Sequence, residues 1–212
     1  MNTQALIERL ASDTRPAPAP ARLQLARAGL LGGLVGILLL LTLWGINPQM
    51  RAMAVHPAFL TKMVWLAGLI AFSVHGLLRL SRPGLSAGQT WKGLALCLLA
   101  MWGLGVAQSW QAQADARLAL WLGASWPVCS VSIAALALPV LAALFWALRQ
   151  LAPTNPALAG AVAGVLASSL AACLYSLHCP ETSFGFFALW YVAGMAAVTA
   201  LGAALGQRLL RW

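Results

Sequence analysis

Six long apolar stretches constrain the fold of this chain more than any other feature. A helix that crosses a lipid bilayer needs roughly 20 mostly apolar residues. The stretches that meet this need are residues 28–46, 63–80, 93–110, 128–148, 157–177 and 186–206. Only 8% of the 212 residues are charged, so too little polar surface remains to cover a water-soluble core. The sequence therefore predicts an all-α membrane protein, a bundle of six transmembrane helices.

The positions of Lys and Arg predict the orientation of this bundle. With a cytoplasmic N-terminus, 10 of the 13 basic residues lie in inner segments, and the outer ones are Arg51, Lys62 and Arg117. Inner loops carry the positive excess in membrane proteins, so we expect both termini in the cytoplasm. The net charge of +9 then follows from topology and requires no nucleic-acid partner. Basic residues near the inner surface also favour contact with anionic membrane lipid.

The first 27 residues form a segment distinct from the membrane domain of residues 28–212. Leu6, Ile7 and Leu10 recur at near-helical spacing and predict a short cytoplasmic amphipathic helix. Alternating Pro and Ala then predict an extended spacer before the first span. Because so short a helix is marginal on its own, a partner would have to order it. The alternative is a disordered tail that only sets topology.

Small residues recur every fourth position in the last two spans. They are Gly160, Gly164, Ser168 and Ala172 in the fifth span, and Gly194, Gly202 and Gly206 in the sixth. In lipid, small residues at this spacing let two helix backbones approach closely. The pattern favours a compact bundle. A homodimer interface would use the same residues, and the pattern does not decide between the two.

The acidic residues weigh against transport. All four of them, Glu8, Asp13, Asp115 and Glu181, lie outside the predicted spans. Pumps and coupled transporters use an intramembrane carboxylate, so a small transporter or metal-efflux accessory is disfavoured. The sequence also contains no HExxH, GxSxG, phosphate-loop or CxxC motif. We therefore expect a protein that is not an enzyme and requires no cofactor.

Two cysteines far apart in sequence are expected at the same outer surface. Cys129 opens the fourth predicted span, and Cys179 follows the fifth. If these spans are neighbours the thiols can meet, and a disulfide would need their Cα atoms within about 7 Å. Such a bond would persist in an oxidising compartment. Cys97 and Cys173 lie inside spans, where free cysteines commonly serve as small packing residues.

The chemistry of this pair has several interpretations. His178 precedes Cys179 and, when protonated, would lower the pKa of its thiol. His178, Cys129 and Cys179 would also suit a soft metal ion as ligands. A disulfide that never changes state is the plainer alternative. A membrane thiol–disulfide oxidoreductase is a further one, although a CxxC motif is missing.

Three segments carry a resemblance to a known family. They are Leu6-Ile7-Glu8-Arg9-Leu10-Ala11-Ser12-Asp13 followed by Pro16, Tyr175-Ser176-Leu177-His178-Cys179-Pro180-Glu181 with Trp190-Tyr191 downstream, and Leu209-Leu210-Arg211-Trp212. Together they resemble the six-span membrane anti-sigma proteins of proteobacteria called negative regulator of sigma F. The resemblance covers essentially the whole chain. Where the family often has Pro-Val, this chain has Pro16-Ala17, and Pro-Ala repeats replace a basic spacer.

The resemblance implies a function for both ends of the molecule. The N-terminal segment would hold an extracytoplasmic-function sigma factor at the bacterial inner membrane, away from RNA polymerase. Two outward-facing cysteines, matching Cys129 and Cys179, would respond to heavy-metal or oxidative stress.

These roles assign residues to the binding of the sigma factor. Leu6, Ile7 and Leu10 would dock in a hydrophobic groove of the sigma factor, with Asp13 meeting basic residues of that partner. The sensor would comprise Cys129, Cys179 and His178, the residues that would also hold a soft metal ion if such an ion is the signal.

Overall fold

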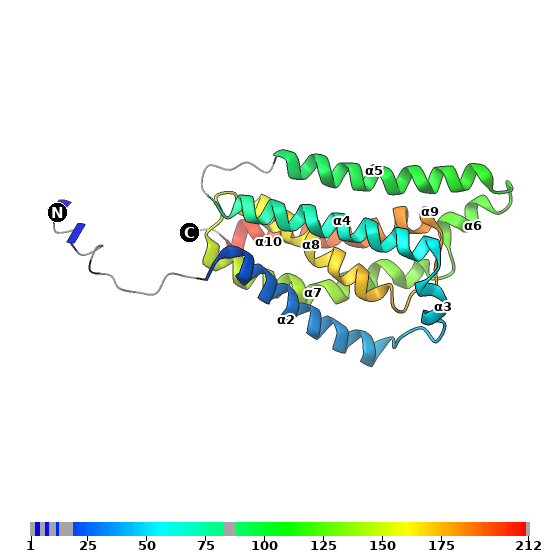
Figure 1. Ribbon diagram of the computed structural model, residues 1–212, viewed down its shortest axis with the longest axis horizontal. Coiled ribbons are helices and arrows are strands. Elements are labelled where there is room, and N and C mark those ends of the chain that lie inside the picture. The colour runs from blue at the N-terminus through cyan, green and yellow to red at the C-terminus, as the bar shows by residue number, and fades with distance from the viewer. Residues whose placement is uncertain (1–2, 5–6, 9–11, 13–18, 83–87, 211–212) are drawn as a thin grey trace.

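The computed structural model describes residues 3–4, 7–8, 12, 19–82 and 88–210. In this part of the chain every regular element is helical (Figure 1). The elements are α2 (Ala21–Leu43), α3 (Met50–Ala54), α4 (Pro57–Leu80), α5 (Gly88–Gln111), α6 (Arg117–Leu122), α7 (Trp126–Leu151), α8 (Pro156–Tyr175), α9 (Phe184–Phe186), the π-helix η1 (Phe187–Tyr191) and α10 (Val192–Leu209). Elements α9, η1 and α10 follow one another without a break.

The prediction of six apolar spans is confirmed. Among the described residues, 6 helical segments are long and apolar enough to cross a membrane. The third of them, α5, has the lowest mean hydropathy, 1.4. Helix α4 begins at Pro57 rather than at residue 63, because proline suits the first helical turn and the His56 ring accepts a hydrogen bond from the Ala58 amide (3.2 Å). The spacing of apolar residues alone does not reveal such a capped helix start.

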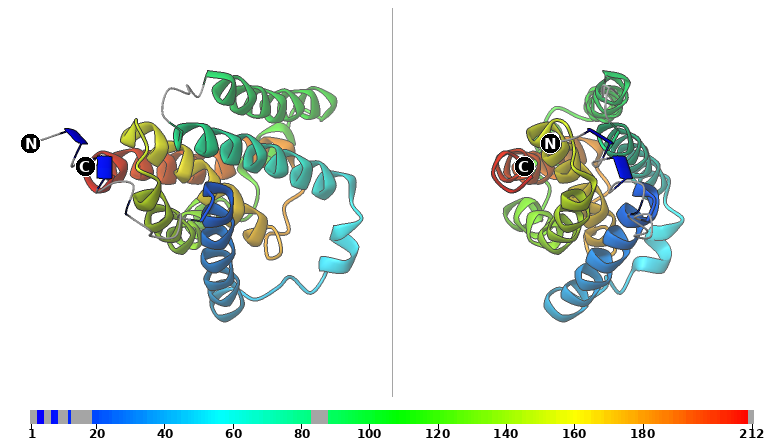
Figure 2. Two further views of the ribbon diagram at one scale, coloured as in Figure 1. Left: turned by 60° about the vertical axis from the view of Figure 1, so that its left-hand side comes forward. Right: turned by 90° about the vertical axis from the view of Figure 1, so that its left-hand side faces the viewer.

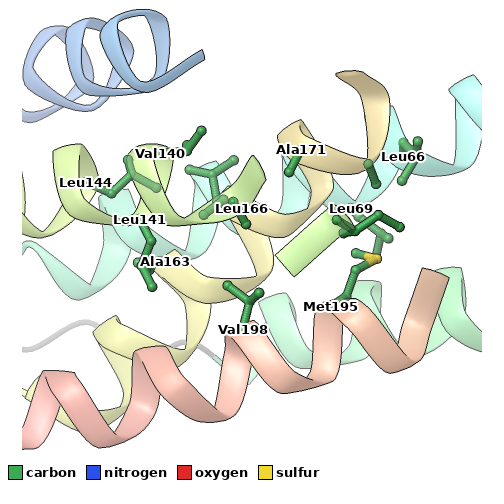
Figure 3. Packing of buried hydrophobic residues seen from close by; sticks show 14 of the residues in the cluster. Leu66, Leu69, Val140, Leu141, Leu144, Ala163, Leu166, Ala171, Met195 and Val198 are labelled. Atoms are coloured by element: carbon green, nitrogen blue, oxygen red, sulfur yellow. The ribbon is translucent and has the colours of Figure 1, made fainter. Parts of the chain in front are cut away.

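The core of the bundle lies between α4, α7, α8 and α10. Figure 3 shows buried side chains of these four helices facing one another, among them Leu66, Leu144 and Val198. Helix α5 lies at the edge of the bundle, where it packs against α4 and α9 (Figure 2). Helix α2 packs mainly on α7 and leaves much of its apolar surface exposed. This arrangement is expected for helices whose outer faces contact lipid.

The small residues of the last two spans pair α8 with α10 inside the chain. A Cβ atom added at Gly160 would collide with the backbone carbonyl of Gly202, and one added at Gly202 would collide with that of Gly160. Gly206 is equally close to the backbone at Pro156. The close approach that the sequence pattern predicts is thus satisfied within one molecule. These glycines are therefore not available to a homodimer interface.

Filling this contact should destabilise the bundle. We expect Gly160→Val to lower the free energy of unfolding by roughly 1–3 kcal/mol, because the added side chain forces α8 and α10 apart. The matched control is Gly103→Val in α5, where an added Cβ meets nothing within 4 Å. Both variants carry the same helix-propensity change, so thermal unfolding in detergent isolates the packing term. Equal melting temperatures for the two variants would contradict this account.

The bundle has two distinct ends. The start of α2 and the end of α10 lie at one end, and α3, α6 and α9 lie at the other, which we call the α3/α6 end (Figure 1). The starts of α4 and α7 and the connection after α8 also lie at the α3/α6 end. The topology thus gathers residues that are far apart in sequence.

Candidate functional site

The structure brings Cys129 and Cys179 together at the α3/α6 end. Cys129 lies near the start of α7, and Cys179 lies in the connection between α8 and α9. Both cysteines are free, and the Cys129 thiol donates a hydrogen bond to the Cys179 sulfur. The expected meeting of the two sulfurs is therefore observed, in the reduced state.

The exposure of the two thiols was predicted wrongly from the sequence. Each cysteine is 0% exposed in this structure. The cause is Glu181, whose Oε1 accepts hydrogen bonds from the amides of Ala124 (2.8 Å) and Ser125 (3.1 Å) and from the Ser125 hydroxyl (3.2 Å). These bonds hold the connection after α8 against the start of α7, where it covers the two sulfurs.

Lys62 is the second residue whose place differs from the prediction. It was expected to be an outer surface charge, but it is 0% exposed near the start of α4. In the described part of the chain its Nζ has no hydrogen-bond partner. Instead it lies 4.6 Å from the ring centroid of Phe187, 5.2 Å from that of Phe59 and 5.5 Å from that of Tyr191. Cation–π contacts of this kind offset part of the cost of burying an ammonium group.

The π-helix η1 supplies two of these three rings. Phe187 and Tyr191 are its first and last residues, both are fully buried, and their centroids lie 5.3 Å apart. The Tyr191 hydroxyl lies 3.4 Å from the Ser176 hydroxyl. A single π-helical turn inside an α-helix is uncommon and often marks a functional site. We call Phe59, Phe187 and Tyr191 the aromatic cage of Lys62.

The surroundings of Cys179 favour its thiolate. The hydrogen bond from the Cys129 thiol holds the pKa of Cys179 below its usual value, against the opposing effect of burial. The Glu181 amide, the positive charge of Lys62 and the Tyr191 hydroxyl act in the same direction. Since thiolates rather than thiols are the nucleophiles, these contacts favour Cys179 over Cys129 as the nucleophile of the pair. The site is thus a buried thiol pair beside a buried cation.

His178 was predicted as a third sensor residue. Its Nδ1 lies 3.2 Å from the carbonyl oxygen of Gly45, and its ring packs 5.8 Å from that of Tyr175. It therefore links the connection after α8 to the residues that follow α2. Among the described residues, no group of three His, Cys, Asp or Glu side chains is placed to hold a metal ion. The predicted set of three ligands is not assembled in this structure.

Some of the remaining predicted residues lie outside the described part of the chain, and others lie inside it. Of the docking residues, Leu6, Leu10 and Asp13 lie outside the described residues. Ile7 is helical and 53% exposed. Cys97 is half-buried in α5, and its carbonyl accepts a hydrogen bond from the Trp65 indole (3.0 Å).

Lys62 and its aromatic cage were not predicted from the sequence. A lysine near the end of an apolar stretch is indistinguishable in sequence from an ordinary loop charge. The π-helical turn leaves no pattern of its own in Phe187–Tyr191. The one available signal was Lys62 itself, which follows the apolar run Ala58-Phe59-Leu60 and precedes another.

Comparison with known proteins identifies the family. The family model described as negative regulator of sigma F matches residues 10–212. The chain is 37% identical over 213 residues to a protein of Azospira oryzae named probable anti-sigma-F factor NrsF. It is 41% identical over 222 residues to the anti-sigma-F factor NrsF of Caulobacter vibrioides. Each alignment covers 100% of both chains. No solved structure matches the chain. The full-length agreement with a family of sigma-factor regulators shows that this chain belongs to the negative regulator of sigma F family.

Proposed function

We propose that this protein is an inner-membrane anti-sigma factor that releases an extracytoplasmic-function sigma factor when its Cys129–Cys179 pair is oxidised from the periplasmic side. The observation that carries the proposal is the pair itself. Two free thiols share a hydrogen bond beside a buried cation, in a chain whose full-length relatives are named anti-sigma factors. A thiolate favoured at Cys179 supports a pair that changes its redox state over a disulfide that only staples the fold.

The arrangement of the helices supports a periplasmic site. The start of α2 and the end of α10 share one end of the bundle, and the thiol pair lies at the opposite, α3/α6 end (Figure 1). Arg22 and Arg27 lie in α2 near its start, and Arg208 lies in the last turn of α10. Because positive charge gathers on the cytoplasmic side, this end faces the cytoplasm and the thiol pair faces the periplasm. Basic residues there also contact anionic lipid.

The N-terminal segment is the proposed binding site for the sigma factor. Ile7 is exposed, and the Ser12 amide donates a hydrogen bond to the Glu8 carbonyl (2.9 Å), as in a helical turn. Leu6, Ile7 and Leu10 form the apolar stripe of such a helix and suit a hydrophobic groove. Asp13 pairs with basic residues of the sigma factor and sets the orientation.

The proposed signal is an oxidant. Thiolate attack on a peroxide gives a sulfenic acid, which a neighbouring thiol converts to a disulfide. The pair provides both sulfurs, and the covered site admits a small peroxide more readily than a protein thiol. A soft metal ion as the signal remains a prediction from the sequence.

A sigma-dependent reporter in living cells tests this function. Cys129→Ser and Cys179→Ser should each abolish the change in reporter output on peroxide addition, because one sulfur cannot form the intramolecular disulfide. Cys97→Ser is the matched control, since Cys97 is a half-buried packing residue of α5, and it should respond like the wild type. If both single variants of the pair still respond normally, the sensor role is wrong.

A further inference from the structure

Lys62 presents a problem of charge balance. Its ammonium is fully buried, and among the described residues no acceptor is within hydrogen-bonding distance of Nζ. The aromatic cage offers ring faces but no negative charge. A buried charge without a partner is strongly unfavourable. The balancing charge must therefore come from an acidic group close to the cage.

Four acidic groups near Lys62 could supply this negative charge. Burial is the largest influence on Lys62; among the acidic groups Cys179 acts on it most strongly, followed by Cys129, Cys173 and Glu181. The Glu181 carboxylate is already engaged by three donors of the connection between α6 and α7. Cys173 lies deeper, inside α8. Of the four groups Glu181 acts least on Lys62, so the sulfur pair is the principal source of negative charge beside it.

We propose that Lys62 is the counter-ion of the Cys129–Cys179 pair and that oxidation of the pair, by removing that negative charge, releases Lys62 from its aromatic cage. The inference rests on the proposed redox role of the thiols. It makes Lys62 a positioning residue, which converts a chemical event at sulfur into a displacement of α4. The reduced pair and Lys62 together are neutral, whereas the disulfide and Lys62 together carry one positive charge.

The charge change follows from the balanced reaction. The Cys179 thiolate attacks a peroxide, the O–O bond breaks, hydroxide leaves and a sulfenic acid forms. The Cys129 thiol then attacks the sulfenic sulfur, the S–S bond forms, and the thiol proton leaves with the hydroxyl group as water. The pair loses two electrons and hydrogen peroxide gains them. One thiolate and one thiol have become a neutral disulfide, and the negative charge has departed as hydroxide.

The loss of this charge acts on several elements at once. Lys62 belongs to α4, two rings of its cage belong to η1, and the sulfurs belong to α7 and the connection after α8. Helix α4 runs from the site to the opposite end of the bundle, where the proposed cytoplasmic surface lies (Figure 1). An ammonium that leaves the cage therefore moves the start of a helix that reaches the other side.

The chain offers an internal reference for a direct test. Lys62 and Lys92 are the only lysines in the sequence, and Lys92 is exposed in α5. The full-length protein in detergent is treated with a small amine-reactive reagent before and after oxidation by hydrogen peroxide. Mass spectrometry then gives the extent of labelling of Lys62 relative to Lys92. Because both lysines react in the same sample, differences in reagent or pH cancel.

In the reduced protein we expect Lys92 to be labelled and Lys62 to be protected. After the disulfide has formed, Lys62 labelling relative to Lys92 should rise by roughly tenfold, which corresponds to about 1.4 kcal/mol in the equilibrium for release from the cage. Proof of the disulfide in the same sample, with an unchanged labelling ratio, would overturn the inference. It would leave the proposed sensor function standing, because the assay contains no sigma factor.

The double variant Cys129→Ser/Cys179→Ser sharpens the test. It lacks the proposed counter-ion from the start, so its Lys62 should be labelled strongly both before and after peroxide. The control Cys97→Ser should behave like the wild type. If Lys62 stays protected in the double variant, the cage alone holds the ammonium, and the inference is wrong.

Discussion

Deleting residues 1–15 from the full-length protein is expected to make sigma-dependent transcription constitutive. These residues contain the whole proposed docking surface. The dissociation constant for the sigma factor should rise by at least roughly tenfold, since each such step is only about 1.4 kcal/mol and the deletion removes several apolar contacts. A reporter driven by the sigma factor, without added peroxide, measures the outcome.

Point variants separate docking from any effect of the deletion on membrane insertion. Ile7→Asp places a charge in the apolar stripe and should reproduce most of the deletion phenotype. Ser12→Ala changes a residue that, at helical spacing, falls opposite the apolar stripe, and it should leave repression intact. Pull-down of the sigma factor with residues 1–27 reports binding without the membrane domain. Full repression by the deletion protein, with membrane levels equal to those of the wild type, would rule out the N-terminal segment as the docking site.

The six apolar helices were predictable because a lipid environment would impose simple rules. Each span must satisfy its own backbone hydrogen bonds and present apolar side chains, which leaves long apolar runs in the sequence. The small-residue stripe of α8 was visible for a similar reason. Its partner was not, because the same spacing serves an intramolecular contact and a dimer equally well. Only the collision of Gly160 with the backbone of Gly202 assigns it to α10.

The candidate site was only half predictable. That Cys129 and Cys179 meet follows from the topology of neighbouring spans. That they are covered does not, because covering depends on hydrogen bonds that the amides of Ala124 and Ser125 donate to Glu181. Backbone amides carry no sequence signature. The burial of Lys62 likewise depends on Phe187 and Tyr191 from a distant helix, and the residues beside Lys62 in the sequence do not reveal those two rings.

Replacing Lys62 by Met is expected to slow disulfide formation by peroxide roughly tenfold at a pH below about 6, the pKa of Cys179 in the wild type, and by much less at neutral pH. Met has similar length and lacks the charge. The positive charge of Lys62 favours the Cys179 thiolate, so its loss raises the pKa of that thiol. A rise of one unit costs a factor of about ten in thiolate at a pH below the pKa. The rate of disulfide formation, measured on the purified protein, should recover as the pH is raised.

Conservative and distant variants complete the experiment. Lys62→Arg keeps the charge and should retain more of the wild-type rate than Lys62→Met, although the larger guanidinium fits the cage less well. Lys92→Met removes an exposed lysine and should leave the pH profile unchanged. A profile for Lys62→Met that superimposes on that of the wild type would show that the cation does not act on the sulfurs.

For Lys62→Met, we expect the melting temperature to stay equal or rise while the rate of disulfide formation falls. A buried ammonium that lacks a hydrogen-bond partner is costly, so an apolar side chain of the same length should leave the melting temperature equal or higher. A lysine kept only for packing would give the reverse pattern, with lower stability and an unchanged rate. Protein that is at least as stable but slower to oxidise is therefore the specific signature of a charge retained for its effect on the thiol pair.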